Sequence, residues 1–406
     1  MPPSLPDSMN LSTARADLWG VELSPFALKL AAMLEWAAIP YRWLPREGSR
    51  LQNSAAAFKI ARAKRKGRVR RHGGESELDE FPQVPFLITP DQTVHYDSSA
   101  LATWIDAEHP PEHGELLPRD PVLNFLVRFI DEAFDEFGLY MVHHNRWVLA
   151  AADNGAGKRL AAEFSHFLPA IATRRMAVQF PERQVRRLPY LFSVATPEFH
   201  AELPQALMPP ARSGFPGTHA LLDAAWHEYL AAMESLLEVQ PYLFGARFTL
   251  ADASAYGELS MNLTDATAAT VLEERAPRTY RWLCSIRDGE HRGVQGQLEV
   301  TDALQPLLDV IAETFVPLMR QNEEAYEDAL ARGETTFNEA AFDRGLALYD
   351  GELRGQAFRH VVKTFQVRTW RDLRVCWTAL TSEERLALGR RLPGLEEAFG
   401  PPRSPS

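Results

Sequence analysis

The chain of 406 residues carries a formal net charge of −11 and is 46% hydrophobic, which is ordinary for a soluble globular protein. The negative charge argues against nucleic acid as the main partner. Two cysteines, Cys284 and Cys376, exclude a disulfide framework and a cysteine metal cluster. The sequence shows neither a signal-peptide pattern nor an apolar run of about 18 residues, so we expect a cytoplasmic protein without a membrane span.

The first predicted elements follow a loose leader at residues 1–14. A short apolar run at 18–21 predicts a strand. Ser24-Pro25 predicts the start of a helix, because Ser is a favoured N-cap and Pro a favoured first helical residue. Residues 41–44 predict a second strand. The turn places the Ser24 hydroxyl beside the first helical amides, where the helix dipole favours an anion.

Residues 46–80 form a strongly charged segment. Eight Lys or Arg residues lie between Lys59 and Arg71, and four acidic residues follow at 75–80. One interpretation is a solvated helix and loop whose charges compensate each other. The other is a patch that binds phosphate, nucleic acid or an acidic partner.

A second pair of strands is predicted after this segment. Val84-Pro85 leads into the apolar run 86–88, and residues 94–96 suit the other strand of a hairpin. Asp97 then has the position of an N-cap, followed by a helix. A Pro-rich stretch after that helix marks the linker to a second domain.

A long helix is predicted from Pro121 to Trp147. Its apolar residues recur at helical spacing, and four acidic residues lie on the opposite side: Asp131, Glu132, Asp135 and Glu136. The adjacent His143 and His144 cannot share one helix face. We therefore expect one packed and one solvated histidine rather than a metal pair.

The C-terminal part is also predicted to be mainly helical. Thr249 to Asp252 has the spacing of a structural capping box, and Thr381 to Glu384 has the same spacing. Apolar residues at 304–318 and 337–348 predict two more helices. Residues 360–370 predict a strand or an extended segment, because they are rich in β-branched and aromatic residues.

Three stretches together resemble the glutathione S-transferase family: residues 17–45, 81–110 and 242–259. They are similar to the family's opening βαβ unit, to its Val-Pro, hairpin, acid-Ser and helix sequence, and to its helical capping segment. They occur in the family's order, over roughly residues 15–290. The nearest resemblance is to a bacterial branch of long transferase-like proteins.

The resemblance implies a fold of three parts behind the leader. An α/β thioredoxin-like, glutathione-binding domain would span residues 15–112. An all-α domain of the glutathione-transferase type would span 113–290. A mainly helical extension at 291–406 would pack on it, because its apolar stripe needs a partner surface.

The resemblance also implies an enzyme that uses the glutathione thiolate as a nucleophile on a small electrophile, by conjugation, dehalogenation or isomerisation. Glutathione would be the co-substrate, with no metal. Ser24 would stabilise the thiolate as the catalytic residue, unless it only caps its helix. Val84 would offer its backbone beside a cis Pro85. Ser98 would bind the γ-glutamyl carboxylate, and Asp97 the ammonium, from its own subunit or across a dimer interface.

Five aromatic residues are candidate walls of an electrophile pocket between the domains: Phe26, Phe129, Phe137, Tyr140 and Trp147. Aromatic residues on such helices are more often core. The family pairs as homodimers, so a homodimer is expected. The alternative is a non-catalytic binding or scaffold protein that keeps the fold. The basic segment 59–71 and the extension favour that alternative, although one of the cations could meet a glutathione carboxylate. The sequence does not identify the electrophile.

Overall fold

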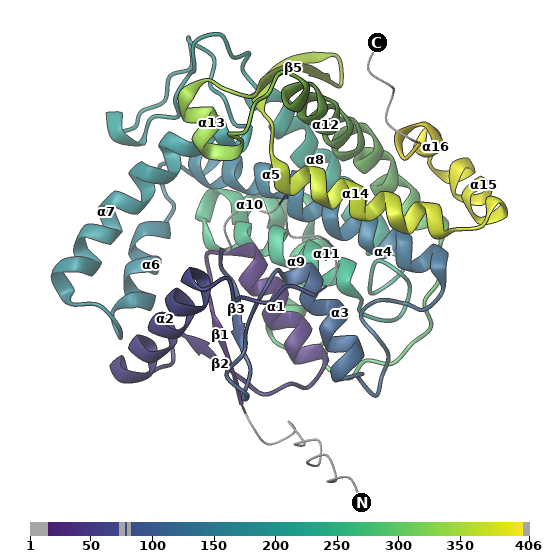
Figure 1. Ribbon diagram of the computed structural model, residues 1–406, viewed down its shortest axis with the longest axis horizontal. Coiled ribbons are helices and arrows are strands. Elements are labelled where there is room, and N and C mark those ends of the chain that lie inside the picture. Colours follow the sequence, from purple (N-terminus) through teal and green to yellow (C-terminus); the bar gives the residue numbers. More distant parts are fainter. Residues whose placement is uncertain (1–14, 73–77, 79–82, 401–406) are drawn as a thin grey trace, which may run out of the picture.

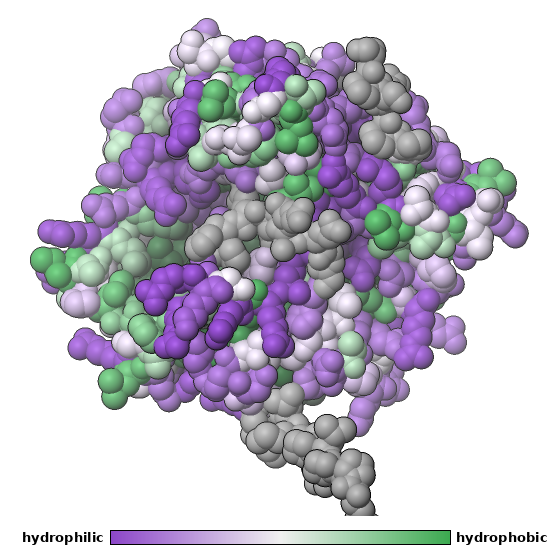
Figure 2. All heavy atoms as spheres, viewed as in Figure 1, coloured by the Kyte–Doolittle hydropathy of each residue, from purple (hydrophilic) through white to green (hydrophobic). Residues whose placement is uncertain are grey.

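The computed structural model describes residues 15–72, 78 and 83–400. The chain runs from a small α/β unit through a helical body to a C-terminal extension that lies across that body (Figure 1). Hydrophilic side chains dominate the face in Figure 2 and gather over the second helix of the small unit. No described helix combines the length and the apolar character that a bilayer span requires.

The small unit holds a four-stranded sheet in the order β2-β1-β3-β4. Its strands are β1 (Ala16–Trp19), β2 (Tyr41–Leu44), β3 (Phe86–Ile88) and β4 (Val94–Tyr96), and its helices are α1 (Pro25–Trp36), α2 (Arg50–Arg65) and α3 (Ser98–Glu108). Alternate residues of β3 face opposite sides. Phe86 and Ile88 pack with α2, and Leu87 lies in the core with α1 and α3. These elements agree with the predicted strands and helices.

The strand register brings three loops to one end of this sheet. β1 runs parallel to β2 and antiparallel to β3, and Trp19 pairs with Phe86. Phe86 also pairs with Tyr96 at the end of β4. The end of β1, the start of β3 and the end of β4 therefore lie at the same end of the sheet, which we call the sheet edge. The residues that follow or precede these strands meet there.

The helical body consists of eight α-helices in the described chain. They are α4 (Pro121–Ala133), α5 (Leu139–His144), α6 (Ala156–Phe164), α7 (Ala170–Arg187), α8 (His219–Leu236), α9 (Leu250–Leu259), α10 (Ala266–Arg275) and α11 (Pro277–Arg287). The π-helical turns η3 (Phe134–Gly138) and η4 (Asn145–Leu149) join α4 and α5 into the predicted long helix. His144 is buried as expected, but His143 is half-buried and burial lowers its pKa to about 3, so the expected solvated ring is not found.

The helix α9 lies against both α1 and α4 and so joins the small unit to the body. The predicted capping box at its start is confirmed. The Asp252 carboxylate accepts hydrogen bonds from the Thr249 amide (2.9 Å), the Thr249 hydroxyl (2.8 Å) and the Leu243 amide (2.8 Å). Both Thr249 and Asp252 are fully buried, which fixes the start of α9 inside the core.

The extension contains α12 (Gln305–Ala331), α13 (Asn338–Arg344), the hairpin strands β5 (Leu348–Leu353) and β6 (Gln356–Val361), α14 (Thr364–Ala379), α15 (Ser382–Arg391) and α16 (Leu395–Ala398). The capping box at Thr381 is confirmed. The extended conformation predicted for 360–370 is wrong from Thr364 onward. That part belongs to α14, because Val367, Trp370 and Trp377 recur at helical spacing and bury one face.

Candidate functional site

Ser24 lies at the shared sheet edge, directly before α1. Its backbone is extended (φ −101°, ψ 116°), Pro25 opens the helix, and the residue is buried. The Ser24 hydroxyl makes no capping hydrogen bond, although the position is that of an N-cap. The side chain therefore does not perform the structural task that was the alternative to catalysis.

The loop before β3 approaches this turn closely. A Cβ placed on Gly20 would lie 2.9 Å from Ala27 Cβ, so glycine lets β1 and α1 come this close, and it would lie in ordinary contact with Pro85 Cβ at 3.7 Å. The Val84–Pro85 peptide bond is cis, as the resemblance implies. Val84 is 38% exposed, so this residue lies at the surface.

Asp97 and Ser98 complete the edge at the start of α3. Asp97 has a left-handed φ of 71° and accepts from the Ala100 amide at 3.2 Å, which confirms the predicted cap. Ser98 is buried beside it, at the first turn of α3. Ser24, Pro85, Asp97 and Ser98 therefore lie around one end of the small unit.

Two arginines already hold the Asp97 carboxylate. Arg71 Nε lies 2.7 Å and Arg368 Nη2 2.9 Å from Asp97 Oδ2. Burial alone would raise the pKa of Asp97, but Arg368, Arg71 and the Ala100 amide outweigh it and keep the pKa below the usual value. Arg368 belongs to α14 of the extension, and its guanidinium stacks over Phe365 at 4.2 Å. The extension thus reaches the position that the resemblance assigns to the substrate ammonium.

A buried charge cluster lies behind α3. Lys29 of α1 is completely buried, and its Nζ lies 2.5 Å from Asp131 Oδ1 and 2.6 Å from Asp135 Oδ2. Ser99 accepts from Lys29 Nζ at 2.8 Å, and Ser254 donates to both carboxylates. The acidic side of the long helix is therefore largely internal, and Lys29 pairs with two of its carboxylates.

The same cluster is the one group among the described residues whose oxygens are close enough to hold a metal ion: Asp131, Glu132 and Asp135. Lys29 lies between two of these carboxylates, so an ammonium already provides the positive charge. Glu258 is 1% exposed beside this cluster, and burial raises its pKa well above the usual range. Burial likewise raises the pKa of Glu136 to about 7, although a hydrogen bond with Gln366 of α14 acts to lower it.

Four of the five candidate pocket residues are packed in the interior. Phe129, Phe137 and Tyr140 are fully buried, and Trp147 is 3% exposed. Their rings contact other aromatic rings, such as Phe315, Tyr229, Phe192 and Phe180. Phe26 is half-buried. Core packing accounts for the first four, so a role as pocket walls stays a prediction.

The α6–α7 hairpin covers the turn that carries Ser24. Glu163 of α6 accepts from the Glu22 amide with both carboxylate oxygens, at 3.1 and 3.3 Å. Leu23 packs in a cluster with Leu160 and Trp147. Burial raises the pKa of Glu163 to about 7, although Arg46 opposes it. The helices α6 and α7 thus shape one side of the candidate site.

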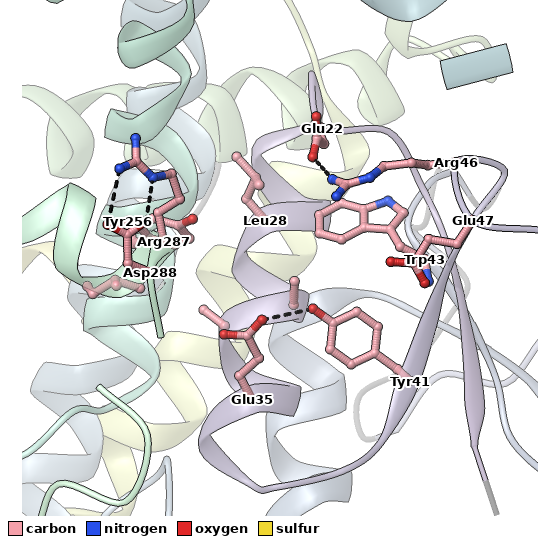
Figure 3. A pocket seen from close by; sticks show the side chains of 13 residues that line it. Glu22, Leu28, Glu35, Tyr41, Trp43, Arg46, Glu47, Tyr256, Arg287 and Asp288 are labelled. Atoms are coloured by element: carbon pink, nitrogen blue, oxygen red, sulfur yellow. Dashed lines mark hydrogen bonds and ion pairs between the residues drawn. The ribbon is translucent and has the colours of Figure 1, made fainter. Parts of the chain in front are cut away.

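A separate pocket of about 400 Å³ lies between α1, β2, α9 and α11 (Figure 3). Its lining includes Glu35, Tyr41, Trp43 and Tyr256, and none of the predicted site residues. The Tyr41 hydroxyl donates to Glu35 at 3.0 Å. The polar groups drawn are largely paired with each other, so this pocket shows no reactive group aimed at a substrate.

Sequence reasoning missed Lys29, Glu163 and Arg368. Lys29 could have been noticed in the sequence, because it is the one charged residue between Pro25 and Met33 in an otherwise apolar helix. Glu163 and Arg368 lie in segments that the family resemblance did not cover or did not resolve into helices. Only the folded chain brings them to the sheet edge.

Two sequence models match the chain: the N-terminal domain of glutathione S-transferases over residues 23–108, and the C-terminal domain over residues 209–288. No curated protein matches the sequence. Among solved structures, the chain is similar to a glutathione S-transferase from Rhodospirillum rubrum, with 16% identity, a TM-score of 0.37, and coverage of 72% of this chain and 91% of that chain.

Two further solved structures are similar to the same extent. One is a glutathione S-transferase of Methylobacterium radiotolerans in complex with glutathione sulfonate (18% identity, TM-score 0.36, covering 71% of this chain and 99% of that chain). The other is the beta-etherase LigF of Sphingobium (17%, 0.41, 72% and 98%). The family assignment rests on the two domain matches, in the order and at the places where the thioredoxin-like sheet and the helical body are found. Residues 23–108 and 209–288 are thus the N-terminal and C-terminal domains of the glutathione S-transferase family.

Proposed function

We propose that this protein binds glutathione at the sheet edge and uses its thiolate as a nucleophile on a small electrophile. The observation that carries the proposal is Ser24, whose hydroxyl does not cap α1 although it stands at the helix N-terminus. A hydroxyl donor and a helix N-terminus both favour a thiolate over a thiol. Val84-Pro85 and Ser98 lie at the same edge, where they would hold the peptide.

The alternative is a binding or scaffold protein that keeps the fold without catalysis. The pairing of Asp97 with Arg71 and Arg368 favours this alternative, because a substrate ammonium would have to share a carboxylate that two guanidinium groups already hold. The catalytic proposal therefore requires glutathione to be held mainly through its carboxylates and thiol. Arg71 also pairs with Asp372 at 3.4 Å, so a substrate carboxylate would have to compete with two protein carboxylates for these guanidinium groups.

The test is the ultraviolet absorbance of bound glutathione thiolate against pH, in the wild type and in Ser24→Ala. We expect the thiol pKa to rise and turnover with a generic electrophile to fall about tenfold or more, for one lost charge-assisted hydrogen bond of roughly 1.5–3 kcal/mol. Glutathione affinity should change little, because Val84 and Ser98 remain. If the wild type and Ser24→Ala gave identical titrations and identical turnover, the catalytic role of Ser24 would be wrong and the binding-protein alternative would replace it.

We also propose a cytoplasmic homodimer, on the strength of the family membership and of two free cysteines, which suit a reducing compartment. Light scattering at micromolar concentration should give twice the mass of the chain. A mass of one chain over that range would contradict the homodimer without bearing on glutathione binding.

A further inference from the structure

A strongly basic groove of about 610 Å³ lies at the C-terminal end of α2, away from the candidate glutathione site. Five cationic side chains line it: Lys59, Arg62, Lys66, Arg68 and Arg70. The other polar lining residues are Gln92 and Thr93, and no acidic residue is among the described lining. This concentration of positive charge stands on a chain whose net charge is −11.

The backbone holds these cations in place. The chain leaves α2 through Gly67, which has a φ of +58°, and the Arg68 amide donates to the Ala63 carbonyl at 2.9 Å. The Arg70 amide then donates to the Val94 carbonyl at 2.8 Å, and the Tyr96 amide to the Arg70 carbonyl at 3.0 Å. The segment therefore runs alongside β4 as an added edge, so the groove has two fixed walls.

The cations are not neutralised by the described residues. Arg62, Lys66 and Arg68 form no ion pair with any described carboxylate, whereas arginines elsewhere on the surface are paired, such as Arg354 with Glu228 and Glu313. Lys59 bonds the neutral side chain of Gln92. Like charges held close together repel each other, and a bound anion removes that cost.

Compensation of these charges by the acidic residues at 75–80 concerns positions outside the described residues. A role toward the helix dipole explains only part of the groove. Cations in the last turn of a helix complement its dipole, which accounts for Arg62, Lys64 and Arg65. It does not account for Arg68 and Arg70, which follow the helix and line the same groove. Cations from two successive segments around one groove point to an anionic ligand.

We infer that this groove binds a ligand with clustered phosphate groups. Guanidinium groups bind phosphate oxygens through two parallel hydrogen bonds, and lysines add point charges. The groove has room for several phosphates, which matches five cations better than one anion does. Arg71 turns to Asp97 while its neighbour Arg70 lines the groove, so this site is separate from the glutathione site and does not depend on the proposed function.

The source of the phosphates is either a soluble polyphosphorylated molecule or a phosphorylated lipid headgroup. Leu51 and Phe58 are 84% and 68% exposed on α2, the helix whose C-terminal end lines the groove. Apolar side chains beside a basic cluster suit a membrane surface. Two arms of one experiment separate these sources.

In the first arm, inorganic tripolyphosphate is titrated calorimetrically into the full chain at low and at high salt. We expect one saturable site that weakens as salt rises. Arg62→Glu/Lys66→Glu should weaken binding by at least about tenfold, and so should Arg68→Glu alone. The matched control is Arg174→Glu/Arg175→Glu on the exposed surface of α7, which makes the same charge change and should bind like the wild type. Circular dichroism verifies that each variant is folded.

In the second arm, the chain is sedimented with phosphatidylcholine vesicles that contain phosphatidylinositol phosphates. Sedimentation that tripolyphosphate displaces identifies the headgroup as the source, and absence of sedimentation identifies a soluble ligand; both support the site. The inference is overturned if the wild type does not bind tripolyphosphate, if the control loses binding as much as the groove variants do, or if only a single-stranded oligonucleotide binds.

Discussion

Asp97 is the residue whose surroundings differ most from what its sequence context implies. It caps α3 as predicted, yet its carboxylate also joins Arg71 from the small unit to Arg368 from the extension. All three side chains are nearly or largely withdrawn from solvent. A pair with this degree of burial is costly to break, because the remaining charges have no water to replace the lost partner.

Asp97→Asn should therefore destabilise the protein by about 3 kcal/mol at neutral pH in urea unfolding. The matched control is Asp350→Asn, which removes the carboxylate from an ion pair with Arg359 whose aspartate side chain is 69% exposed. That change should cost less than about 1 kcal/mol, since exposed pairs are screened by water. Equal losses in the two variants would mean that the Asp97 triad adds nothing beyond a surface pair.

The difference between wild type and Asp97→Asn should also depend on pH. The folded pKa of Asp97 lies below its ordinary value, so the ionised form is favoured by folding. Its stabilising contribution is then fully present above the ordinary pKa and is lost as the pH falls through the folded pKa. The gap in unfolding free energy between the two proteins should narrow as the pH falls below about 4.

At this scale the sequence predicts what lies within one local segment. Ser24, Pro85 and Asp97 are recognised because a turn, a strand start and a helix start each have a local signature. The two arginines that hold Asp97 come from different parts of the chain, Arg71 from the small unit and Arg368 from the extension. No local pattern links Arg368 to Asp97. Lys29 likewise meets Asp131 and Asp135 only when α1 and α4 pack.

At the level of the elements, helices were predicted correctly where the apolar spacing and the capping residues agreed. The helix α14 was missed because the composition of its first residues favours a strand. Its β-branched and aromatic residues suggested an extended segment, but their spacing matches a helix with one buried face. Packing against α4 and α12 decided the conformation, because a weak local preference is easily overridden by burial of large side chains.

The capping box of α9 should contribute more to stability than its exposed counterpart at α15. Asp252→Ala leaves the Leu243 and Thr249 amides buried without their acceptor, so we expect a loss of at least about 2 kcal/mol in urea unfolding. Glu384→Ala removes the equivalent acceptor of Thr381 at the surface and should cost clearly less, because water replaces the lost acceptor. Similar costs for both would show that burial of the box is irrelevant.

For the whole molecule, the described chain has one principal core. Apolar residues of α1, α4, α8, α12 and α14 belong to the same cluster of buried side chains. The family resemblance predicted the small α/β unit and the helical body. The apolar stripe of the extension predicted that the extension packs on another surface. The sequence could not predict that the extension would reach past the helical body to the small unit, because the contact depends on ion pairs between distant residues, such as Arg368 with Asp97 and Asp372 with Arg71.

This arrangement predicts how the chain responds to limited proteolysis. Trp377 of α14 lies 5.3 Å from Phe125 of α4 between ring centroids, and Tyr229 of α8 bonds Thr314 of α12 at 3.0 Å. Residues 291–406 therefore lack a complete core when separated, because their apolar faces are matched to helices outside the segment. A cut near Arg292 should give two pieces that stay together in size-exclusion chromatography.

The same segment expressed alone should show no fixed near-ultraviolet dichroism. Release of 291–406 as a soluble, independently folded fragment would contradict the proposal that the extension packs on the helical domain. Trp377→Ala provides the graded version of the test. It should make the cut pieces separate at a lower urea concentration than in the wild type, since a buried Trp-to-Ala change costs about 3–5 kcal/mol.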